Sequence, residues 1–192
     1  METPGPAAAP ASPDRRKMTR LDRQFQAFVE EQGSTIYRFV LRLVDNAQDA
    51  EDLTQEALLR VYRTAEKLDG REESLLAWGL RIARNLVIDY RRRRRAILTE
   101  GEVLDQAFAA RQPGAEEIYD RSTSANAVAE AIDGLPQQFR EVLVLRYQSE
   151  LSYEQIATVL DVPVTTVETR LFRAKKSLRA SLQAKGIKSS AG

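Results

Sequence analysis

The sequence predicts an all-α protein with two small helical domains joined by a flexible linker. An N-terminal helical bundle is followed by a C-terminal four-helix domain with a helix-turn-helix. Apolar residues recur at helical spacing over residues 21–95 and again over residues 125–185. The segment between them, residues 96–124, is acidic, contains glycine and proline, and is too long for an ordinary connection within a domain. Residues 1–20 and 186–192 are expected to form tails, the first of them disordered.

The composition excludes several classes of protein. The chain has 192 residues, is 43% hydrophobic and 30% charged, and contains neither cysteine nor histidine. Disulfides, most zinc sites and the usual Ser/His or Cys/His catalytic arrangements are therefore excluded. No apolar run reaches the length of a membrane span, and the N-terminus lacks the apolar core of a signal peptide. We expect a cytoplasmic protein with no catalytic residues, no metal, no cofactor and no membrane insertion.

The net charge of +1 conceals an uneven distribution of charge. Residues 81–95 hold seven arginines against Asp89 alone, residues 96–134 carry a net charge of −6, and residues 135–192 carry +4. The order basic, acidic, basic favours two modules that face nucleic acid, separated by a segment that avoids it.

The first domain is predicted to begin with two helices, the second of them capped by Ser34. A third helix, capped by Asp45 or Asn46, has a core face formed by Ala50, Leu53, Ala57, Leu58 and Val61. Its other face carries Asp52, Gln55, Glu56, Leu59 and Arg63. Plain solvation is the usual role of such a face, but an apolar leucine among the charges is the alternative signal of a partner surface.

Ser74 is predicted to cap a fourth helix that follows a polar loop and runs to about Arg95. Its inner stripe is Leu75, Trp78, Ile82, Ala83 and Leu86. Five successive arginines, Arg91–Arg95, cover the whole circumference of the helix end. One or two arginines would satisfy the helix dipole, so a phosphate-binding surface explains the run better.

The second domain is predicted to start with a helix that ends at Gly134, followed by a helix that Pro136 opens. A helix-turn-helix then extends from Leu151 to Leu178. Ser152 and Gln155 form a capping box at its start, and a proline separates its two helices. The inner positions of its second helix are Val167, Leu171, Ala174 and Leu178.

The outer face of this second helix combines hydroxyl, guanidinium and ammonium groups, which suit phosphates and base edges. It carries Thr165, Thr166, Thr169, Arg170, Arg173 and Lys176. An ordinary helical hairpin with a solvated basic end is the alternative. The agreement of cap, break and basic outer face favours a DNA-binding unit.

Three stretches together resemble the extracytoplasmic-function class of bacterial RNA polymerase sigma factors, within the sigma-70 family. They are DAEDLTQEALLRVYR (Asp49–Arg63), AWGLRIARNLVIDYRRR (Ala77–Arg93) and the segment Leu135–Leu178. The resemblance implies sigma region 2 over residues 21–95 and sigma region 4 over residues 125–185. It further implies a subunit that binds core RNA polymerase and directs initiation by reading the promoter −10 and −35 elements.

The resemblance also implies which residues contact which partner. Contacts to the clamp helices of the largest polymerase subunit fall on Asp49, Asp52, Gln55, Glu56, Leu59 and Arg63. Contacts to the −10 element, opened to single strands, fall on Leu68, Asp69, Gly70, Arg71, Ser74, Trp78, Arg81, Arg84, Asn85, Arg91, Arg92 and Arg93. Contacts to the double-stranded −35 element fall on Thr165, Thr166, Glu168, Thr169, Arg170, Phe172, Arg173 and Lys176. The flap of the second-largest subunit and an anti-sigma factor are further implied partners.

Three positions depart from the family pattern. Gly79 stands where a large apolar residue is usual, costs about 1 kcal/mol of helix propensity and is expected to soften its helix. Glu168 replaces a common Lys or Arg, and it either completes a capping box with Thr165 or accepts a hydrogen bond from a cytosine amino group. Asp161 replaces a frequent glycine, and aspartate tolerates the left-handed conformation.

Two alternative functions remain at this stage. A stand-alone helix-turn-helix regulator would account for residues 135–192 but would leave the face with Asp52, Gln55 and Glu56 unexplained. A sigma-like decoy for an anti-sigma factor would keep the protein-binding faces and would not need the arginines.

Overall fold

The computed structural model describes residues 19–44, 46–65, 74–100 and 123–186, and these residues form helices and turns only. The predicted tails lie largely outside these ranges, as does most of the predicted linker. Within the described ranges, none of the helices combines the length and the apolar character needed to cross a bilayer.

Helix α1 spans Arg20–Leu41 without a break, so the prediction of two helices divided at Ser34 was wrong. Thr19 caps it: the Thr19 hydroxyl accepts from the Asp22 amide, and the Asp22 carboxylate accepts from the Thr19 amide. Phe28, Ile36 and Phe39 lie on one buried face. This continuous apolar face outweighs the propensity cost of glycine and serine at mid-helix, about 1 kcal/mol for glycine.

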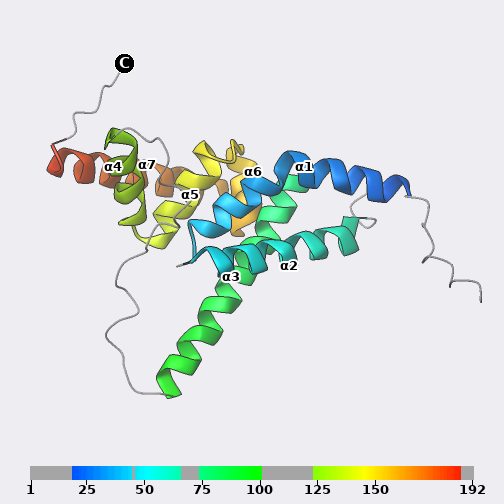
Figure 1. Ribbon diagram of the computed structural model, residues 1–192. Coiled ribbons are helices and arrows are strands. Elements are labelled where there is room, and N and C mark those ends of the chain that lie inside the picture. Colours follow the sequence, from blue (N-terminus) through cyan, green and yellow to red (C-terminus); the bar gives the residue numbers. More distant parts are fainter. Residues whose placement is uncertain (1–18, 45, 66–73, 101–122, 187–192) are drawn as a thin grey trace, which may run out of the picture.

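Helix α2 spans Ala47–Ala65 and helix α3 spans Leu75–Glu100, both packed on each other and on α1. Asn46 caps α2 through its side-chain oxygen, which accepts from the Asp49 amide at 2.8 Å. Ala50, Leu53, Ala57 and Val61 of α2 are buried, as predicted, whereas Leu58 is only partly buried. Helix α3 extends five residues beyond Arg95, and its C-terminal end projects away from the other helices (Figure 1).

The buried stripe of α3 is rotated relative to the prediction. Its fully buried residues are Ala77, Leu80, Ala83, Leu86 and Val87, whereas Leu75, Trp78 and Ile82 are only half-buried. Small side chains at the crossing bring this face of α3 against α1 and α2.

Gly79 explains how α3 approaches so closely. A Cβ atom at this position would lie 3.1 Å from Ile36 Cδ1, 3.5 Å from Val61 Cγ2 and 3.6 Å from Phe28 Cζ. The glycine therefore sits at a tight three-helix contact inside a continuous helix. Close packing, rather than the expected softening, is the role that this geometry gives Gly79.

The second module consists of α4 (Thr123–Asp133), α5 (Gln137–Tyr147), α6 (Tyr153–Leu160) and α7 (Val164–Ala184). The predicted capping box of α6 is present, since Ser152 and Gln155 bond reciprocally at 2.8 and 3.2 Å. Asp161 ends α6 in the left-handed conformation, with φ at 55°. Pro136 precedes α5 as its N-cap, one position before the predicted one.

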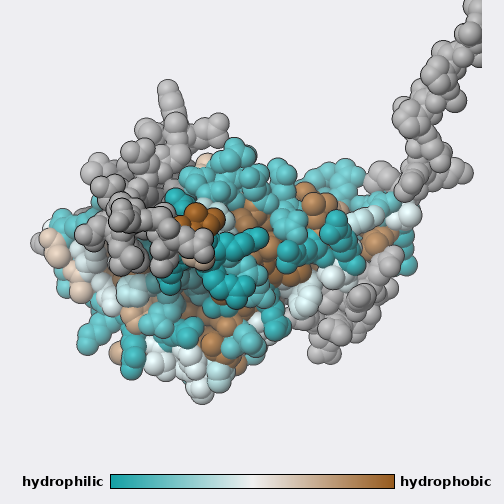
Figure 2. All heavy atoms as spheres, turned by 90° about the horizontal axis from the view of Figure 1, so that it is seen from below, coloured by the Kyte–Doolittle hydropathy of each residue, from teal (hydrophilic) through white to brown (hydrophobic). Residues whose placement is uncertain are grey.

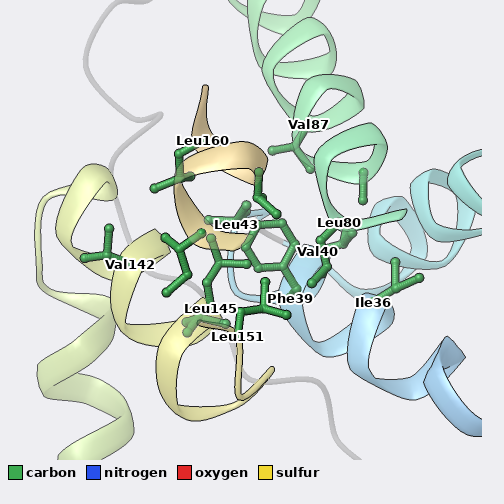
Figure 3. Packing of buried hydrophobic residues seen from close by; sticks show 14 of the residues in the cluster. Ile36, Phe39, Val40, Leu43, Leu80, Val87, Val142, Leu145, Leu151 and Leu160 are labelled. Atoms are coloured by element: carbon green, nitrogen blue, oxygen red, sulfur yellow. The ribbon is translucent and has the colours of Figure 1, made fainter. Parts of the chain in front are cut away.

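The two modules pack against one another. Helix α6 contacts α3, and the buried residues of both modules form one hydrophobic cluster. Figure 3 shows Leu145, Leu151 and Leu160 of the second module gathered around Phe39 and Leu43 of the first. The sequence analysis predicted two domains and did not predict this contact.

Candidate nucleic-acid interface

One face of α2 is exposed and unoccupied by other helices. Asp52, Gln55, Leu59 and Arg63 are exposed on it, at spacings of three and four residues that place them in one stripe. Leu59 retains 50% of its surface. Glu56 is partly exposed and forms an ion pair with Arg60 at 2.7 Å.

Asp49 differs from the rest of the predicted polymerase-binding set. Its carboxylate accepts hydrogen bonds from the Tyr90 hydroxyl and the Asn46 side chain, and it lies 3.9 Å from Arg94. Burial raises the pKa of Tyr90, and the hydrogen bond to Asp49 raises it further. Asp49 thus ties the start of α2 to the middle of α3.

The first part of the predicted −10 surface lies where α3 begins. Ser74 directly precedes α3, and Leu68, Asp69, Gly70 and Arg71 fall outside the described residues. The half-buried Trp78 donates from its indole N–H to the Thr64 hydroxyl at 3.3 Å. The Arg81 guanidinium lies 5.9 Å from the centre of the Trp78 ring.

Further along α3, residues exposed to solvent alternate with residues that contact the second module. Asn85, Arg92 and Arg93 are exposed, and Arg92 pairs with Asp89 at 3.1 Å. Arg84 points instead into the second module. Its Nε lies 3.3 Å from the carboxylate of Glu141, which is only 3% exposed.

Arg91 also bridges the modules. Its guanidinium donates to the backbone oxygen of Leu43 and to the side chain of Gln137 at the start of α5. Beside it, a hollow of about 430 Å³ is lined by Ile88, Arg91, Arg92, Arg95, Ala96 and Gln137. The arginine run therefore has one side against α5 and another open to solvent.

The predicted −35 surface forms a continuous face of α7. Exposed on it are Thr165, Glu168, Thr169, Phe172, Arg173 and Lys176, with Thr166 and Arg170 half-buried beside them. Phe172 is 71% exposed, which is unusual for a phenylalanine without a partner to cover it. Figure 2 shows the side of the molecule that lies below in Figure 1, where hydrophilic side chains cover most of the surface and apolar side chains are exposed between them.

The capping box predicted between Thr165 and Glu168 is absent. Helix α7 begins at Val164 with Pro163 as its N-cap and no side-chain cap, so Thr165 already lies inside the helix. Its carbonyl accepts from the Thr169 hydroxyl at 2.9 Å. Glu168 is exposed on the outer face, and its other predicted role, accepting from a cytosine amino group, stays a prediction.

The contacts between the modules are what sequence reasoning missed. Arg42 pairs with Asp133 at 3.1 Å, and Arg140 donates to the backbone oxygen of Arg42 at 3.2 Å. One signal was available: Glu141 directly precedes the apolar run Val142–Leu145, a position where a charge needs a buried partner.

The exposed faces of α3 and α7 offer cationic and hydroxyl groups. Among the described residues, no cluster of acidic side chains is arranged to hold a metal ion. Guanidinium, ammonium and hydroxyl groups on two separate helices are suited to phosphates and base edges.

Comparison with family models agrees with this division into two modules. The model described as Sigma-70 region 2 matches residues 28–97, and the model described as Sigma-70, region 4 matches residues 125–178. The first match covers α3 through Ile97, and the second covers the helix-turn-helix.

Similar curated proteins cover most of the chain. The ECF RNA polymerase sigma factor SigE of Mycolicibacterium smegmatis is 35% identical over 93% of this chain and 67% of its own length. The ECF RNA polymerase sigma factor SigW of Bacillus subtilis is 32% identical over 83% of this chain and 89% of its own length.

Two solved structures are similar in fold. One is the sigma factor RpoE in complex with the anti-sigma factor NepR from Bartonella quintana, with a TM-score of 0.70, 23% identity, and coverage of 84% of this chain and 98% of that one. The other is CnrH in complex with the cytosolic domain of CnrY, with a TM-score of 0.60, 25% identity, and coverage of 84% and 89%.

Proposed function

Since the chain belongs to the extracytoplasmic-function class of sigma-70 factors, we propose that α2 binds core RNA polymerase, α3 reads the −10 element and α7 reads the −35 element. The protein is a sigma factor, which directs RNA polymerase to initiate transcription at specific promoters. One observation carries the residue assignment. Each matched family region contains a helix with exposed basic residues, α3 in region 2 and α7 in region 4. A stand-alone regulator and a decoy are not favoured.

The α2 stripe is the proposed polymerase surface. Asp52 and Gln55 flank Leu59, whose half-exposed side chain supplies an apolar anchor among polar neighbours. Glu56 and Arg63 lie at the rim of the stripe. Asp49 acts indirectly in this proposal, since its carboxylate fixes α2 to α3 through Tyr90.

The α3 surface is proposed to hold the opened −10 strand. Asn85 offers an amide for a base edge, and the arginines of the run offer charge to phosphates. Taking a base out of the stack costs a few kcal/mol. Phosphate contacts along α3, together with the loop before Ser74, would offset that cost.

The α7 surface is proposed to lie in the major groove of the −35 element. Thr169 and Arg173 are exposed in its N-terminal half, the part of a recognition helix that meets base edges, and the half-buried Thr166 lies beside them. Lys176 follows on the same face and suits a phosphate.

Further partners follow from family membership. We propose that the second module also contacts the flap of the second-largest polymerase subunit, and that an anti-sigma factor binds the chain. The sigma factor RpoE, which has the same fold, was solved with such a partner. The protein acts where the chromosome is, in the cytoplasm, and has no catalytic activity of its own.

A run-off transcription assay tests the proposed function. Purified protein with core polymerase should initiate at defined positions on a randomised promoter library, while core polymerase alone should not. If no promoter in the library gives more initiation with the protein than with core polymerase alone, the proposal is refuted.

A further inference from the structure

The arginines of the run Arg91–Arg95 do not share one face of α3. Asn85 and Arg92 are about two turns apart and lie on the same side of the helix, whereas Asn85 and Arg94 are about two and a half turns apart. Arg94 therefore lies on the side of α3 opposite Asn85, the residue proposed to meet base edges of the −10 strand. The helical register separates Arg94 from the side that faces DNA.

The surroundings of Arg94 are set by the start of α2. Helix α2 crosses α3 and packs on it (Figure 1). The Arg94 guanidinium donates to the Tyr90 hydroxyl at 2.8 Å and lies 3.9 Å from the Asp49 carboxylate. The guanidinium also lies 6.0 Å from the centre of the Tyr90 ring, and the Tyr90 hydroxyl itself donates to Asp49. These contacts hold the guanidinium beside α2.

Asp49 lies at the N-terminal end of the proposed polymerase surface. It precedes Asp52 and Glu56 by about one and two helical turns, so the three carboxylates follow one side of α2. The Asp49 side chain is 29% exposed and accepts hydrogen bonds from Tyr90 and Asn46. Since these bonds lie within the protein, Arg94 is the charged group that extends the surface beyond Asp49.

Arg94 is accessible to a partner while it is held in place. Its side chain retains 49% of its surface. A guanidinium can bond to a carboxylate through two nitrogens at once, and arginine is enriched among the residues that contribute most to protein–protein binding. An oriented, half-exposed arginine next to the α2 stripe is therefore suited to a protein contact.

The charges of the combined surface indicate the kind of partner. Asp52 and Glu56 are complementary to basic residues, and Arg94 at the end of the surface is complementary to an acidic one. A nucleic acid is negative along its whole length, so the carboxylates that adjoin Arg94 would repel it. A protein surface with a carboxylate next to basic residues fits this pattern better.

We propose that Arg94 belongs to the polymerase-binding surface and binds a carboxylate of the largest polymerase subunit. Asp49 and Tyr90 are positioning residues, because they fix the Arg94 guanidinium beside α2. The inference rests on the proposed function of the α2 stripe. It also divides the arginine run, in which Arg92 and Arg93 serve DNA and Arg94 serves polymerase.

Two single substitutions at neighbouring positions test this inference. Arg94→Gln should weaken binding to core polymerase about tenfold, because it removes one partner of an interfacial ion pair. It should leave the salt slope of promoter binding by the holoenzyme unchanged. Arg93→Gln should instead lower that slope by about one. Anisotropy of the chain labelled at its N-terminal amine measures core binding, and titrations of labelled promoter DNA at several salt concentrations measure the slope.

Arg38→Gln controls for the loss of one positive charge. Arg38 is exposed on α1, outside the proposed surfaces. Its substitution should keep core affinity within about twofold of the unaltered chain and leave the salt slope unchanged. The inference is overturned if Arg94→Gln lowers the salt slope as Arg93→Gln does, which would make Arg94 a DNA contact. It is equally overturned if Arg94→Gln binds core polymerase as well as the Arg38→Gln control.

A double substitution tests the positioning role of Tyr90. Tyr90→Phe removes the hydroxyl that accepts from Arg94 and keeps the ring. It should weaken core binding about threefold in the unaltered chain and have no further effect in the Arg94→Gln variant, because the two residues then act through one contact. Tyr62→Phe is the matched control, since the Tyr62 hydroxyl also donates to a carboxylate of a neighbouring helix, Asp22 of α1, at 2.5 Å. It should leave core binding unchanged. An equal loss from Tyr90→Phe with and without Arg94 would contradict the positioning role.

The unaltered chain separates this inference from the proposed function. If it binds core polymerase and supports run-off transcription while Arg94→Gln binds equally well, the inference alone is overturned. If the unaltered chain neither binds core polymerase nor supports initiation, the proposed function itself is refuted.

Discussion

Helices α3 and α7 carry similar chemistry but differ in access. The outer face of α7 is open to solvent along its length, from Thr165 to Lys176. The corresponding face of α3 is divided, since Arg84 and Arg91 contact the second module while Asn85 and Arg93 are exposed. Composition alone would rate both helices as DNA-binding surfaces, but the tertiary contacts determine which one is free.

The two helices also differ in what positions them. Helix α7 is held by its own module, with Val167, Leu171 and Ala174 buried against α5 and α6. Helix α3 serves both modules, because it packs on α1 and α2 along one side and on α6 along another. The surroundings of a helix shared between modules change if the modules separate, whereas the surroundings of a helix held by one module do not.

The largest expected effect comes from a surface outside both helices. Asp52→Arg with Gln55→Ala should weaken core polymerase binding by roughly 100-fold, because a reversed charge at an interface costs several kcal/mol. Both DNA-facing helices would then lose their function together. Gel-shift or anisotropy titration against core polymerase measures the effect.

Glu31→Arg, a charge reversal at an exposed position of α1, is the matched control and should leave binding unchanged. Holoenzyme formation by the α2 variant at the level of this control would show that the stripe is not the polymerase surface.

Gly79→Leu should damage the first module without touching α7. The added side chain would collide with Ile36 and Val61 in the tight contact of α3, and overpacking of this kind costs about 1–3 kcal/mol. Thermal unfolding followed by circular dichroism should show a lowered Tm. Gly33→Ala is the control, since a Cβ there meets only Val29 at 3.6 Å and alanine gains up to about 1 kcal/mol of helix propensity. Equal stability of the Gly79→Leu variant and the unaltered chain would mean that α3 is not packed closely at Gly79.

Glu168→Lys should strengthen DNA binding by α7 and leave α3 unchanged. The change replaces an exposed carboxylate on the open face by an ammonium group, so general DNA affinity should rise several-fold and the salt slope should steepen by about one. Titrations of duplex −35 DNA at several salt concentrations measure both quantities. An unchanged slope would place Glu168 away from the phosphates.

The smallest expected effect concerns a cap in each module. Hydrogen bonds lower the pKa of Asp22, the largest contribution coming from the Tyr62 hydroxyl and the next from the Thr19 amide. The pKa of Glu154 is lowered by hydrogen bonds from its own backbone amide and from the Ser152 side chain. Because both folded-state values lie below the unfolded ones, these carboxylates stabilise the fold above the unfolded values, 3.8 and 4.5, and this contribution is lost as pH falls through the folded-state values. The free energy of unfolding is measured with urea at pH 6 and at pH 3. It should fall less between these two pH values in the variants Asp22→Asn and Glu154→Gln than in the unaltered chain. An identical loss in the variants and the unaltered chain would contradict this.

Local signals in the sequence predicted the local structure well. Ser152 with Gln155, Asn46 before α2 and the left-handed Asp161 all depend on neighbours a few residues away, and the structure confirms each. The buried faces of α2 and α7 were predictable for the same reason, since apolar spacing within one helix is a local pattern.

Long-range packing accounts for the predictions about α1 and α3 that were wrong and for the contact between modules that was missed. Helix α1 continues through Ser34 because its apolar face packs on α2 and α3 on both sides of that residue. The stripe of α3 is rotated because Gly79 permits a contact that spacing alone does not reveal. The bond between Arg84 and Glu141 joins residues 57 positions apart, and no local pattern encodes such a pair.

Crosslinking from the two helices tests the central claim most directly. A photoreactive amino acid is placed at Asn85 on α3 or at Thr169 on α7, both exposed, and the holoenzyme is bound to promoter DNA. The account predicts that position 85 crosslinks to the −10 element, that position 169 crosslinks to the −35 element, and that the first crosslink depends on core polymerase. Crosslinks from both positions to the same element, or none from position 85 within the −10 element, would contradict it.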